Sequence, residues 1–251
     1  MRFSIITITC NAEKHLYETL NSVALQTFED YEHILWDGGK DGGSSDATLE
    51  IARQFPKVKI YQGRDEGISD AMNKGAEYAR GEFLLHLHAD DYLAHENALL
   101  IVDTAIRQHP SIQWLYGQIA LIDEAGDRKG VGAFHPFDLK RLRKYNTIPH
   151  PATFYSRELF MQARGFRNEL RYAMDYELFL RLSKKATPFA LPKVLTCFRE
   201  HMGSQSSASP LKVADEAYFV RSLHMQSLWE KLRSYRTWKR RRRKILMQQR
   251  Q

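Results

Sequence analysis

The chain has 251 residues, of which 43% are hydrophobic and 27% are charged, and it carries a formal net charge of +7. This length and composition accommodate one sizeable α/β core with a helical extension, and they exclude a fibrous or mainly disordered protein. The two cysteines, Cys10 and Cys197, exclude a disulfide framework and a cysteine-based zinc site, and they are typical of the reducing cytoplasm.

Short β-branched runs alternate with helical patterns through the first half of the chain. We predict strands at Phe3–Thr9, His33–Trp36, Val58–Gln62, Phe83–His88 and Trp114–Leu121. The helical patterns between them cover Ala12–Gln26, Asp46–Gln54, Ile68–Ala79 and Glu96–Gln108. This alternation predicts a doubly wound, Rossmann-like α/β fold in which helices flank a mainly parallel sheet.

The apolar run at the N-terminus is typical of a strand and not of a secretory leader. It extends only from Phe3 to Cys10, and Asn11, Glu13 and Lys14 follow it without a small-residue cleavage site. No stretch approaches the roughly 18 to 20 apolar residues that a membrane-spanning helix needs. We therefore expect that the chain does not cross a membrane by itself.

Polar residues and glycines follow the predicted strands, where ligands of doubly wound sheets bind. These residues are Thr9, Asn11, Asp37-Gly38-Gly39, Asp65-Glu66-Gly67 and Ala89-Asp90-Asp91. One carboxylate can accept hydrogen bonds from a nucleobase or a ribose, and another can hold a divalent cation on a diphosphate. Glycines let the backbone approach the ligand closely. The strand ends therefore predict a site for a nucleoside diphosphate.

Two interpretations of Asp90-Asp91 stay open from the local pattern. The pair follows an apolar strand, where a metal ion or sugar hydroxyls would offset the desolvation of two carboxylates. Aspartate is also common just before a helix, so the same pair is compatible with a cap of the helix predicted from Glu96.

Asp175 and His201 are similarly ambiguous. Asp175 stands near the start of the amphipathic segment Ala173–Leu182, where a carboxylate can act as a general base or simply complement the helix dipole. His201 lies in a predicted loop, where an imidazole can complete a metal shell or remain solvated.

The glycine-rich stretch Asp37–Gly43 lacks the spacing of dinucleotide-binding and P-loop motifs, so we predict a hairpin-like turn there.

After Asp123 the regular pattern weakens, and helical and extended pieces follow from Asp138 to about Glu200. Acceptor sites are commonly built from such less regular segments. The stretch Gly203–Pro210 is typical of a mobile connector.

Five sequence blocks, in this order, resemble the family 2 glycosyltransferases with the GT-A fold. The blocks are S-I-I-T-I-T-C-N from Ser4, D-G-G and S-S-D-A-T between Asp37 and Thr48, D-E-G-I-S-D-A-M-N-K-G from Asp65, G-E-F-L-L-H-L-H-A-D-D from Gly81, and M-D-Y-E-L-F-L-R-L from Met174. The third block is particularly similar to the branch that assembles bacterial exopolysaccharides and O-antigens. The resemblance covers about residues 3–207.

The resemblance implies an inverting, metal-dependent hexosyltransferase that moves a sugar from a UDP- or GDP-linked donor to an acceptor hydroxyl in surface polysaccharide synthesis. Asp175 would be the catalytic base, and Asp91 would bind Mn²⁺ or Mg²⁺. His201 would be a further contact to the metal or diphosphate, and His150, in I-P-H-P-A-T-F, would face the acceptor. The residues implied in donor binding are Thr7, Thr9, Asn11, Asp37, Asp65, Asn73 and Asp90.

The sequence departs from the family pattern at two places. Lys40-Asp41-Gly42-Gly43 lengthens the loop between D-G-G and S-S-D, which leaves the placement of Asp46 open. His88 stands where relatives often have Asp or Asn, so we expect contacts to the donor ribose or sugar to differ.

Two other classes of function are compatible with parts of the sequence. A sugar nucleotidyltransferase is also α/β and metal-dependent, but it would be expected to carry an N-terminal G-x-G-x-R-type loop where this chain reads I-T-C-N-A-E-K. A nucleic-acid-binding adaptor would use the basic tail, but it leaves the carboxylates at the strand ends unexplained.

The excess of positive charge lies near the C-terminus. Residues 211–251 hold 12 Lys and Arg against 3 Asp and Glu, whereas the rest of the chain holds 25 against 27. The near-neutral remainder disfavours a basic cleft for nucleic acid, and we expect no nucleic-acid partner. Apolar residues recur at helical spacing beside the basic cluster Lys239–Lys244; they are Leu228, Leu232, Tyr235 and Trp238.

Such a basic amphipathic helix can lie on an anionic membrane or pack on the protein's own core. We favour the membrane, which predicts a peripheral protein on the inner face of the cytoplasmic membrane and suits a lipid-linked acceptor. The predicted organisation is a nucleotide-sugar-binding half at 1–122, an acceptor-binding and catalytic-base half of the same domain at 123–207, and a basic helical tail at 208–251.

Overall fold

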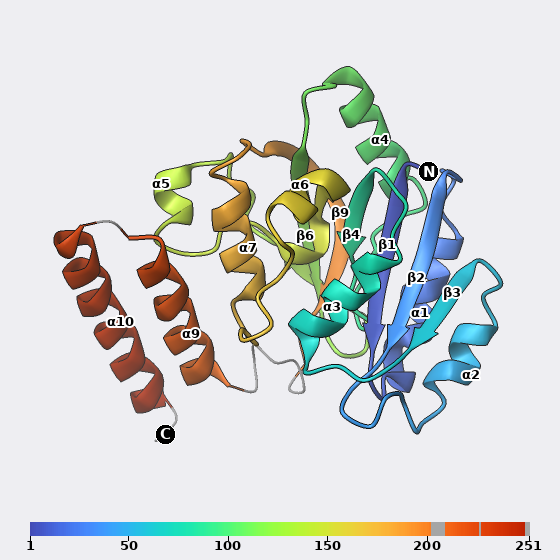
Figure 1. Ribbon diagram of the computed structural model, residues 1–251, viewed down its shortest axis with the longest axis horizontal. Helices are drawn as coiled ribbons and strands as arrows, with labels where there is room; N and C mark the ends of the chain where they lie inside the picture. Colours follow the sequence, from blue (N-terminus) through green and yellow to red (C-terminus); the bar gives the residue numbers. More distant parts are fainter. Residues whose placement is uncertain (202–208, 226, 249–251) are drawn as a thin grey trace.

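The computed structural model describes residues 1–201, 209–225 and 227–248, which form an α/β body with a pair of helices at one end (Figure 1). Residues 203–208 of the predicted connector lie outside the described residues.

The N-terminal half alternates strands and helices as the sequence predicts. Its strands are β1 (Phe3–Thr9), β2 (Tyr31–Asp37), β3 (Val58–Gln62), β4 (Phe83–His86), β5 (Tyr92–Leu93) and β6 (Trp114–Ile122). Its helices are α1 (Glu13–Ala24), α2 (Thr48–Arg53), α3 (Ile68–Glu77) and α4 (Ala98–Gln108). The helical spacing of apolar residues that predicts α1 places Leu16, Leu20 and Val23 on its buried face.

Four strands in the order β3-β2-β1-β4 run parallel, with Phe3 of β1 beside Tyr31 of β2 and Phe83 of β4. Their carboxyl ends therefore meet at one edge of the sheet. Asp90 and Asp91 lie at this edge, directly before the short strand β5. The helix that follows is preceded by Asn97, so the interpretation of the two aspartates as a helix cap is wrong.

The glycine-rich loop after β2 leads to α2 and not to an antiparallel partner. Because β2 and β3 are parallel, the prediction of a hairpin-like turn at Asp37–Gly43 is wrong. The loop does contain a tight turn, in which the Gly42 N–H donates to the carbonyl oxygen of Gly39 at 3.1 Å. The φ angles of +102° at Gly39 and +87° at Gly42 favour glycine at both positions.

The second half extends the same sheet with strands of mixed direction. Its elements are β7 (Arg128–Val131), α5 (Leu139–Leu142), the 3₁₀ helix η1 (His150–Ala152), β8 (Thr153–Ser156), α6 (Arg157–Gln162), α7 (Met174–Leu182) and β9 (Phe189–Arg199). The sheet order is β3-β2-β1-β4-β8-β6-β9-β5, with β7 beside β6. β8 is antiparallel to β4 and β6, whereas β9 is parallel to β6. The predicted α/β architecture is confirmed, and the pairing of β9 with β5 brings the end of β9 next to Asp91.

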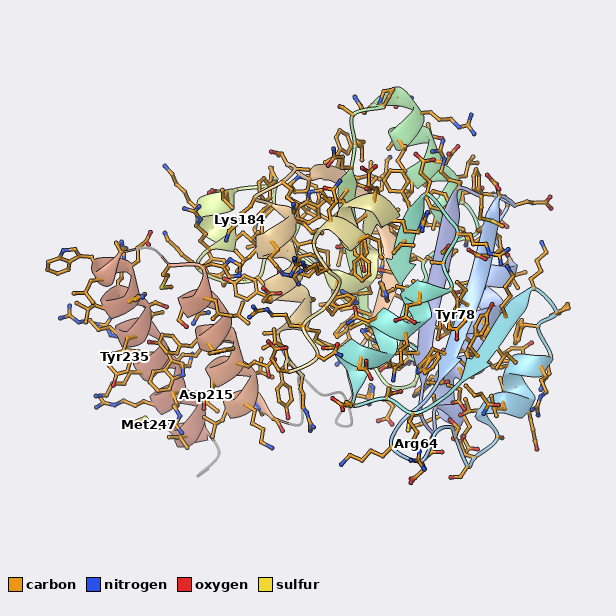
Figure 2. The ribbon with its side chains drawn as sticks, viewed as in Figure 1. Arg64, Tyr78, Lys184, Asp215, Tyr235 and Met247 are labelled. Carbon is orange, nitrogen blue, oxygen red and sulfur yellow. The ribbon has the colours of Figure 1, made fainter. Side chains whose placement is uncertain are left out.

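Two helices end the described chain, α9 (Pro210–Leu223) and α10 (Leu228–Gln248). Val220 of α9 is buried in the main core cluster, and α9 lies between α7 and α10 (Figure 1). Tyr218 of α9 stacks on Trp238 of α10 with ring centroids 5.0 Å apart, and Trp238 Nε1 donates to Asp215 at 2.6 Å. Figure 2 shows Tyr235 on α10 and Asp215 on α9. Within the segment predicted as a tail, α9 is thus part of the packed body and α10 packs on α9.

Candidate active site

A cavity of about 870 Å³ lies where the carboxyl ends of β1, β2 and β4 meet the second half of the fold. Its volume falls within the range of about 300 to 1,000 Å³ that is typical of small-molecule sites. The predicted site residues that line it are Thr9, Asn11, Asp65, Asp90, Asp91, His150, Asp175 and His201. Three others, Thr7, Asp37 and Asn73, do not line it.

Asp37 is fully buried and holds the loop after β2 against β1. Its Oδ1 accepts hydrogen bonds from the hydroxyls of Thr9 at 2.8 Å and Ser44 at 2.5 Å, and its Oδ2 accepts from Ser44 N at 2.8 Å. Thr7 is also buried, with its hydroxyl 3.0 Å from Nε2 of His33, whose pKa is lowered to about 3 by burial. Because neither side chain reaches the cavity, this geometry does not support direct contact of Asp37 or Thr7 with a nucleoside.

Asp65 forms part of the cavity wall and organises the backbone around it. Its Oδ2 accepts hydrogen bonds from Trp36 Nε1 at 3.1 Å and from Gly39 N at 2.7 Å, and its Oδ1 accepts from Gly67 N at 3.1 Å. A Cβ atom on Gly38 would lie 1.8 Å from Oδ2 of Asp65, so only glycine fits at that position. The first glycine of the D-G-G block is thus required by the packing of Asp65.

Asn73 lies away from the cavity and fixes the loop that leads toward α7. Its Nδ2 donates to the carbonyl oxygen of Phe166 at 2.9 Å, and its Oδ1 accepts from Phe166 N at 2.8 Å. A second hydrogen bond from Nδ2 reaches Oδ1 of Asn168 at 2.8 Å. The structure therefore gives Asn73 a positioning role on the second half of the fold.

The two carboxylate oxygens of Asp91 differ in their hydrogen bonding. Oδ1 accepts a hydrogen bond from Arg199 N at 3.0 Å, whereas Oδ2 has no hydrogen-bond partner among the described residues. Burial, with an added contribution from the charge of Asp90, raises the pKa of Asp91 well above its ordinary value. A carboxylate oxygen that is buried at a cavity wall without a partner is one that a bound cation would satisfy.

The side chains around Asp91 come from both halves of the chain. His201 Nε2 lies 2.8 Å from Oδ2 of Asp90. The guanidinium of Arg199 is completely buried, donates to the carbonyl oxygen of Asp90 at 3.1 Å and pairs with Glu18. The sequence analysis selected His201 and missed Arg199, although an arginine two residues before that histidine is a visible signal.

No group of three His, Cys, Asp or Glu side chains able to hold a metal ion is found within residues 1–201, 209–225 and 227–248. Magnesium sites built for nucleotides often use only one or two carboxylates, because water and substrate phosphates supply the remaining ligands. The free oxygen of Asp91, with Asp90 and His201 beside it, fits a site of this kind.

Asp175 lies in the first turn of α7 and lines the same cavity. Its Oδ2 accepts a hydrogen bond from Asn146 Nδ2 at 2.8 Å, and its Oδ1 accepts from Tyr176 N at 2.6 Å. Burial raises the pKa of Asp175 to about 6, against the effect of these hydrogen bonds, and the charge of Glu216 adds to the increase. The group is therefore ionised at neutral pH and is a stronger base than an ordinary aspartate.

Glu216 of α9 holds the segment just before Asp175. Its Oε1 accepts hydrogen bonds from the backbone N–H groups of Arg171 at 2.9 Å, Tyr172 at 2.6 Å and Ala173 at 2.7 Å. These N–H groups precede α7 and have no acceptor within the helix, so Glu216 supplies one. Sequence analysis missed both Glu216 and Asn146, because contacts with residues some 29 to 45 positions away leave no local pattern.

His150 is the predicted acceptor contact, and it faces the cavity beside His88. The two rings lie with centroids 5.2 Å apart, and neither ring nitrogen of His150 has a hydrogen-bond partner among the described residues. Burial lowers the pKa of His150 well below its ordinary value, so the ring is neutral. A neutral imidazole offers one donor and one acceptor, which suits a sugar hydroxyl.

Comparison with known proteins identifies what this chain resembles. The family model described as "Glycosyl transferase family 2" matches residues 4–169. A PGL/p-HBAD biosynthesis glycosyltransferase from Mycobacterium bovis is 37% identical over 184 residues, which cover 71% of this chain and 68% of that protein.

Two solved structures share the fold. Residues 1–349 of TarS from S. aureus, in complex with UDP-GlcNAc, align with a TM-score of 0.73 and 23% identity over 93% of this chain and 69% of that one. The mannosyltransferase PcManGT from Pyrobaculum calidifontis, in complex with GDP-Man and Mn²⁺, aligns with a TM-score of 0.66 and 15% identity over 90% of this chain and 65% of that one.

Proposed function

The chain belongs to glycosyl transferase family 2 and is a glycosyltransferase, and from this membership we propose an inverting, metal-dependent reaction. In this reaction a sugar passes from a nucleoside-diphosphate donor to a hydroxyl of a glycan or lipid-linked acceptor in surface polysaccharide synthesis. Membership of this family disfavours the two other classes of function that the sequence left open, a sugar nucleotidyltransferase and a nucleic-acid-binding adaptor. The observation that carries the proposal is the presence of Asp175, with its raised pKa, in the same cavity as the free oxygen of Asp91.

Asp175 is the proposed catalytic base. The hydrogen bond from Asn146 orients one carboxylate oxygen and leaves lone pairs on it for the proton of the acceptor hydroxyl. As the acceptor hydroxyl loses its proton to Asp175, its oxygen attacks the anomeric carbon from the face opposite the departing diphosphate. This attack inverts the configuration at that carbon. One base is sufficient, because the leaving diphosphate needs charge neutralisation and not a proton.

The proposed donor site lies along the strand ends. Thr9, Asn11 and Asp65 line the cavity there, and Asp90 presents its carboxylate to the ribose or donor sugar. Asp91 and His201 would hold a divalent cation, which when bound neutralises charge on the leaving diphosphate. The complexes of fold relatives with UDP-GlcNAc and with GDP-Man and Mn²⁺ support a nucleotide-sugar donor and a divalent cation for this chain.

A membrane-surface location is the second part of the proposal. None of the described helices combines the length and apolar character needed to span a bilayer. On α10, Tyr235 and Trp238 contact α9, whereas Leu228 is 72% and Trp229 is 82% exposed. We propose that these two exposed side chains and the basic cluster Lys239–Lys244 bind an anionic membrane surface on the cytoplasmic side, where a lipid-linked acceptor would lie.

The reaction is tested with the full-length protein and a panel of UDP- and GDP-sugars in the presence of Mn²⁺ or Mg²⁺. The true donor should raise the melting temperature, because a ligand that binds only the native state stabilises it. Transfer should release a nucleoside diphosphate and invert the anomeric configuration, as read by NMR of the product. Release of pyrophosphate, retention of configuration or full activity in EDTA would contradict the proposal.

Membrane binding is tested by sedimentation with vesicles that contain an anionic phospholipid. The intact protein should sediment at low salt and less at high salt, because screening weakens surface charge interactions. Removal of residues 228–251 should abolish sedimentation while the donor still raises the melting temperature. Failure of the intact protein to bind such vesicles at low salt would refute the location.

A further inference from the structure

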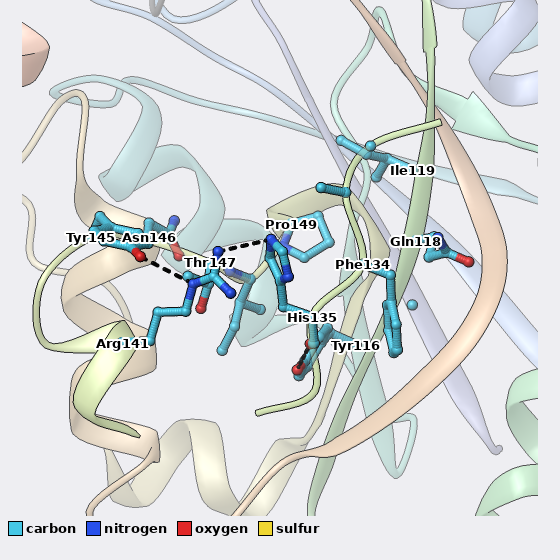
Figure 3. Close-up of a pocket in the computed structure, with 14 residues that line it drawn as sticks. Tyr116, Gln118, Ile119, Phe134, His135, Arg141, Tyr145, Asn146, Thr147 and Pro149 are labelled. Carbon is cyan, nitrogen blue, oxygen red and sulfur yellow. Dashed lines mark hydrogen bonds between the residues drawn. The ribbon is translucent and has the colours of Figure 1, made fainter. Parts of the chain in front are cut away.

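A second cavity, of about 390 Å³, adjoins the candidate active site (Figure 3). It lies between β6 and the segment 132–149, and it shares the lining residues Ile119, Ile148 and Pro149 with the larger cavity. Asn146 lines the second cavity and donates its hydrogen bond to Asp175, which lines the first. A molecule seated in the second cavity is therefore separated from the proposed base by one side chain, that of Asn146.

Arg141 brings a positive charge into this second cavity. Its Nε donates to the hydroxyl of Tyr145 at 3.1 Å, and its Nη2 donates to Nε2 of His135 at 3.0 Å (Figure 3). Because a guanidinium can only donate, Nε2 of His135 must be the unprotonated nitrogen, and the ring is neutral. The partners of Arg141 among the described residues are therefore an uncharged phenol and an uncharged imidazole.

This arrangement differs from that of two other arginines whose side chains are largely buried. Arg181 pairs with Glu177, and the buried Arg199 pairs with Glu18. The guanidinium of the half-buried Arg141 instead has no carboxylate partner among the described residues and lies at a cavity of ligand size, while Asp138 accepts a hydrogen bond from the backbone N–H of Arg141. A guanidinium with neutral partners is suited to a carboxylate or phosphate, since its remaining N–H groups can bind two oxygens at once.

Aromatic rings form another part of the wall. The ring centroids of Tyr116 and Phe134 lie 6.1 Å apart, and the Tyr116 hydroxyl donates to the carbonyl oxygen of His135 at 2.7 Å. This hydrogen bond holds the segment that carries Phe134 and His135 against β6. The cavity thus combines apolar ring faces with one cation, which is the combination that a charged saccharide requires.

We propose that the second cavity is an acceptor subsite for an anionic saccharide. The ring of the acceptor sugar lies on Phe134, which the buried Tyr116 supports from behind, its carboxylate or phosphate binds Arg141, and a hydroxyl extends past Asn146 to Asp175. The inference rests on the proposed function, because it takes Asp175 as the base. A uronic acid and a sugar phosphate supply the same anionic oxygens, so the experiment uses a probe of each kind.

Binding of glucuronate, glucose 1-phosphate and methyl glucoside to the full-length protein is measured by ligand-observed NMR, and UDP and GDP binding is measured in parallel. At least one anionic probe should bind at least tenfold more tightly than the neutral glucoside. Arg141→Gln should weaken binding of that probe by about tenfold or more, because it removes hydrogen bonds to a charged group. Lys144→Gln is the matched control, since it removes an equal charge that does not line the cavity, and it should change binding less than twofold.

Phe134→Ala gives an independent test of the aromatic wall. This substitution should weaken binding of the anionic sugar more than it weakens binding of inorganic phosphate, because phosphate has no sugar ring to stack on Phe134. Binding of glucuronate alone would identify a carboxylate acceptor, and binding of glucose 1-phosphate alone would identify a phosphorylated one.

Equal losses in Arg141→Gln and Lys144→Gln, or equal binding of neutral and anionic sugars, would overturn the subsite. A loss of UDP or GDP binding in Arg141→Gln without a loss of anion binding would overturn it as well, because the cavity would then belong to the donor. Anion binding as expected, together with no transfer from any nucleotide sugar, would instead refute the proposed function and leave the subsite in place.

Discussion

The two sides of the candidate active site are built in different ways. On the strand side, residues 7–91, polar groups bind one another repeatedly: Asp37 accepts hydrogen bonds from Thr9 and Ser44, and Asp65 accepts three. On the irregular side, residues 133–201, the carboxylate of Asp175 has one side-chain partner, Asn146, and its other partner is the adjacent N–H of Tyr176. A side with redundant contacts should tolerate the loss of one contact, whereas a side with single contacts should depend on individual residues.

The largest effect is expected at Asp175, on the irregular side. Asp175→Asn should lower kcat by about 100-fold or more, because the loss of a general base usually costs 10² to 10⁴ in rate. Donor affinity should stay close to that of the wild type in a titration of the nucleotide sugar. The exposed Glu66→Gln is a control with the same chemical change and should keep kcat. A variant that retains more than about a tenth of the wild-type kcat would show that Asp175 is not the base.

The next largest effect is expected at Asp91, where the two sides meet. Asp91→Ala should remove the dependence of donor affinity on Mn²⁺ or Mg²⁺, because it deletes the only buried carboxylate oxygen that lacks a hydrogen-bond partner among the described residues. His201→Ala should weaken donor affinity less, since a neutral imidazole attracts a hard cation less than a carboxylate does. Donor affinity is titrated against cation concentration in each variant. An unchanged dependence of donor affinity on the cation in Asp91→Ala would refute the assignment of Asp91 as a cation ligand.

A smaller effect is expected from Glu216, which does not line either cavity. The wild-type kcat should fall as the pH drops through about 6, because Asp175 must be ionised to act as base and its pKa is about 6. Glu216→Gln keeps an acceptor oxygen for the N–H groups before α7 but removes a charge that raises this pKa. The acidic limb of the pH profile should therefore move to lower pH while kcat at pH 8 changes only a few-fold. A limb that stays in place or moves upward would contradict the role of Glu216.

The smallest effect on turnover is expected on the strand side, where contacts are redundant. Ser44→Ala removes the hydrogen bond that its hydroxyl donates to Asp37 and the one that it accepts from Asn11 N, and it leaves Asp37 bonded to Thr9 and to the backbone N–H of residue 44. The free energy of unfolding should fall by about 2 kcal/mol, at about 1 kcal/mol for each hydrogen bond. Turnover should change less than about threefold, as measured at saturating donor. A loss of turnover comparable to that in Asp175→Asn would refute the contrast between the two sides.

The sequence predicted the strand side well because strands and helices there repeat with clear periods. That regularity placed Thr9, Asn11, Asp65, Asp90 and Asp91 at one edge of the sheet, and the structure brings all of them to the cavity. Residue type and position at a strand end do not show which way a side chain points. For this reason Asp37, which follows the same pattern, is directed into the protein instead.

The irregular side was only partly predictable. Asp175, His150 and His201 were selected through the resemblance to a family, whereas the contacts that position this side were not. Arg199, Asn146 and Glu216 act over long sequence separations, and such pairings have no local periodicity. The mixed strands β8 and β9 were missed for the same reason, since their direction is set by partners far along the chain.

The contacts of Arg199 also affect the order in which the protein can mature. Arg199 meets Asp91 across 108 positions and Glu18 across 181. A ribosome delivers the chain from its N-terminus, so the parallel strands leave the exit tunnel long before β9. During that interval Asp90 and Asp91 stand next to each other without the arginine that later anchors both of them, and closing such a distant contact is slow. The four parallel strands can therefore pair before Asp90 and Asp91 gain the arginine that anchors them, and the proposed cation site is complete only after β9 has been synthesised.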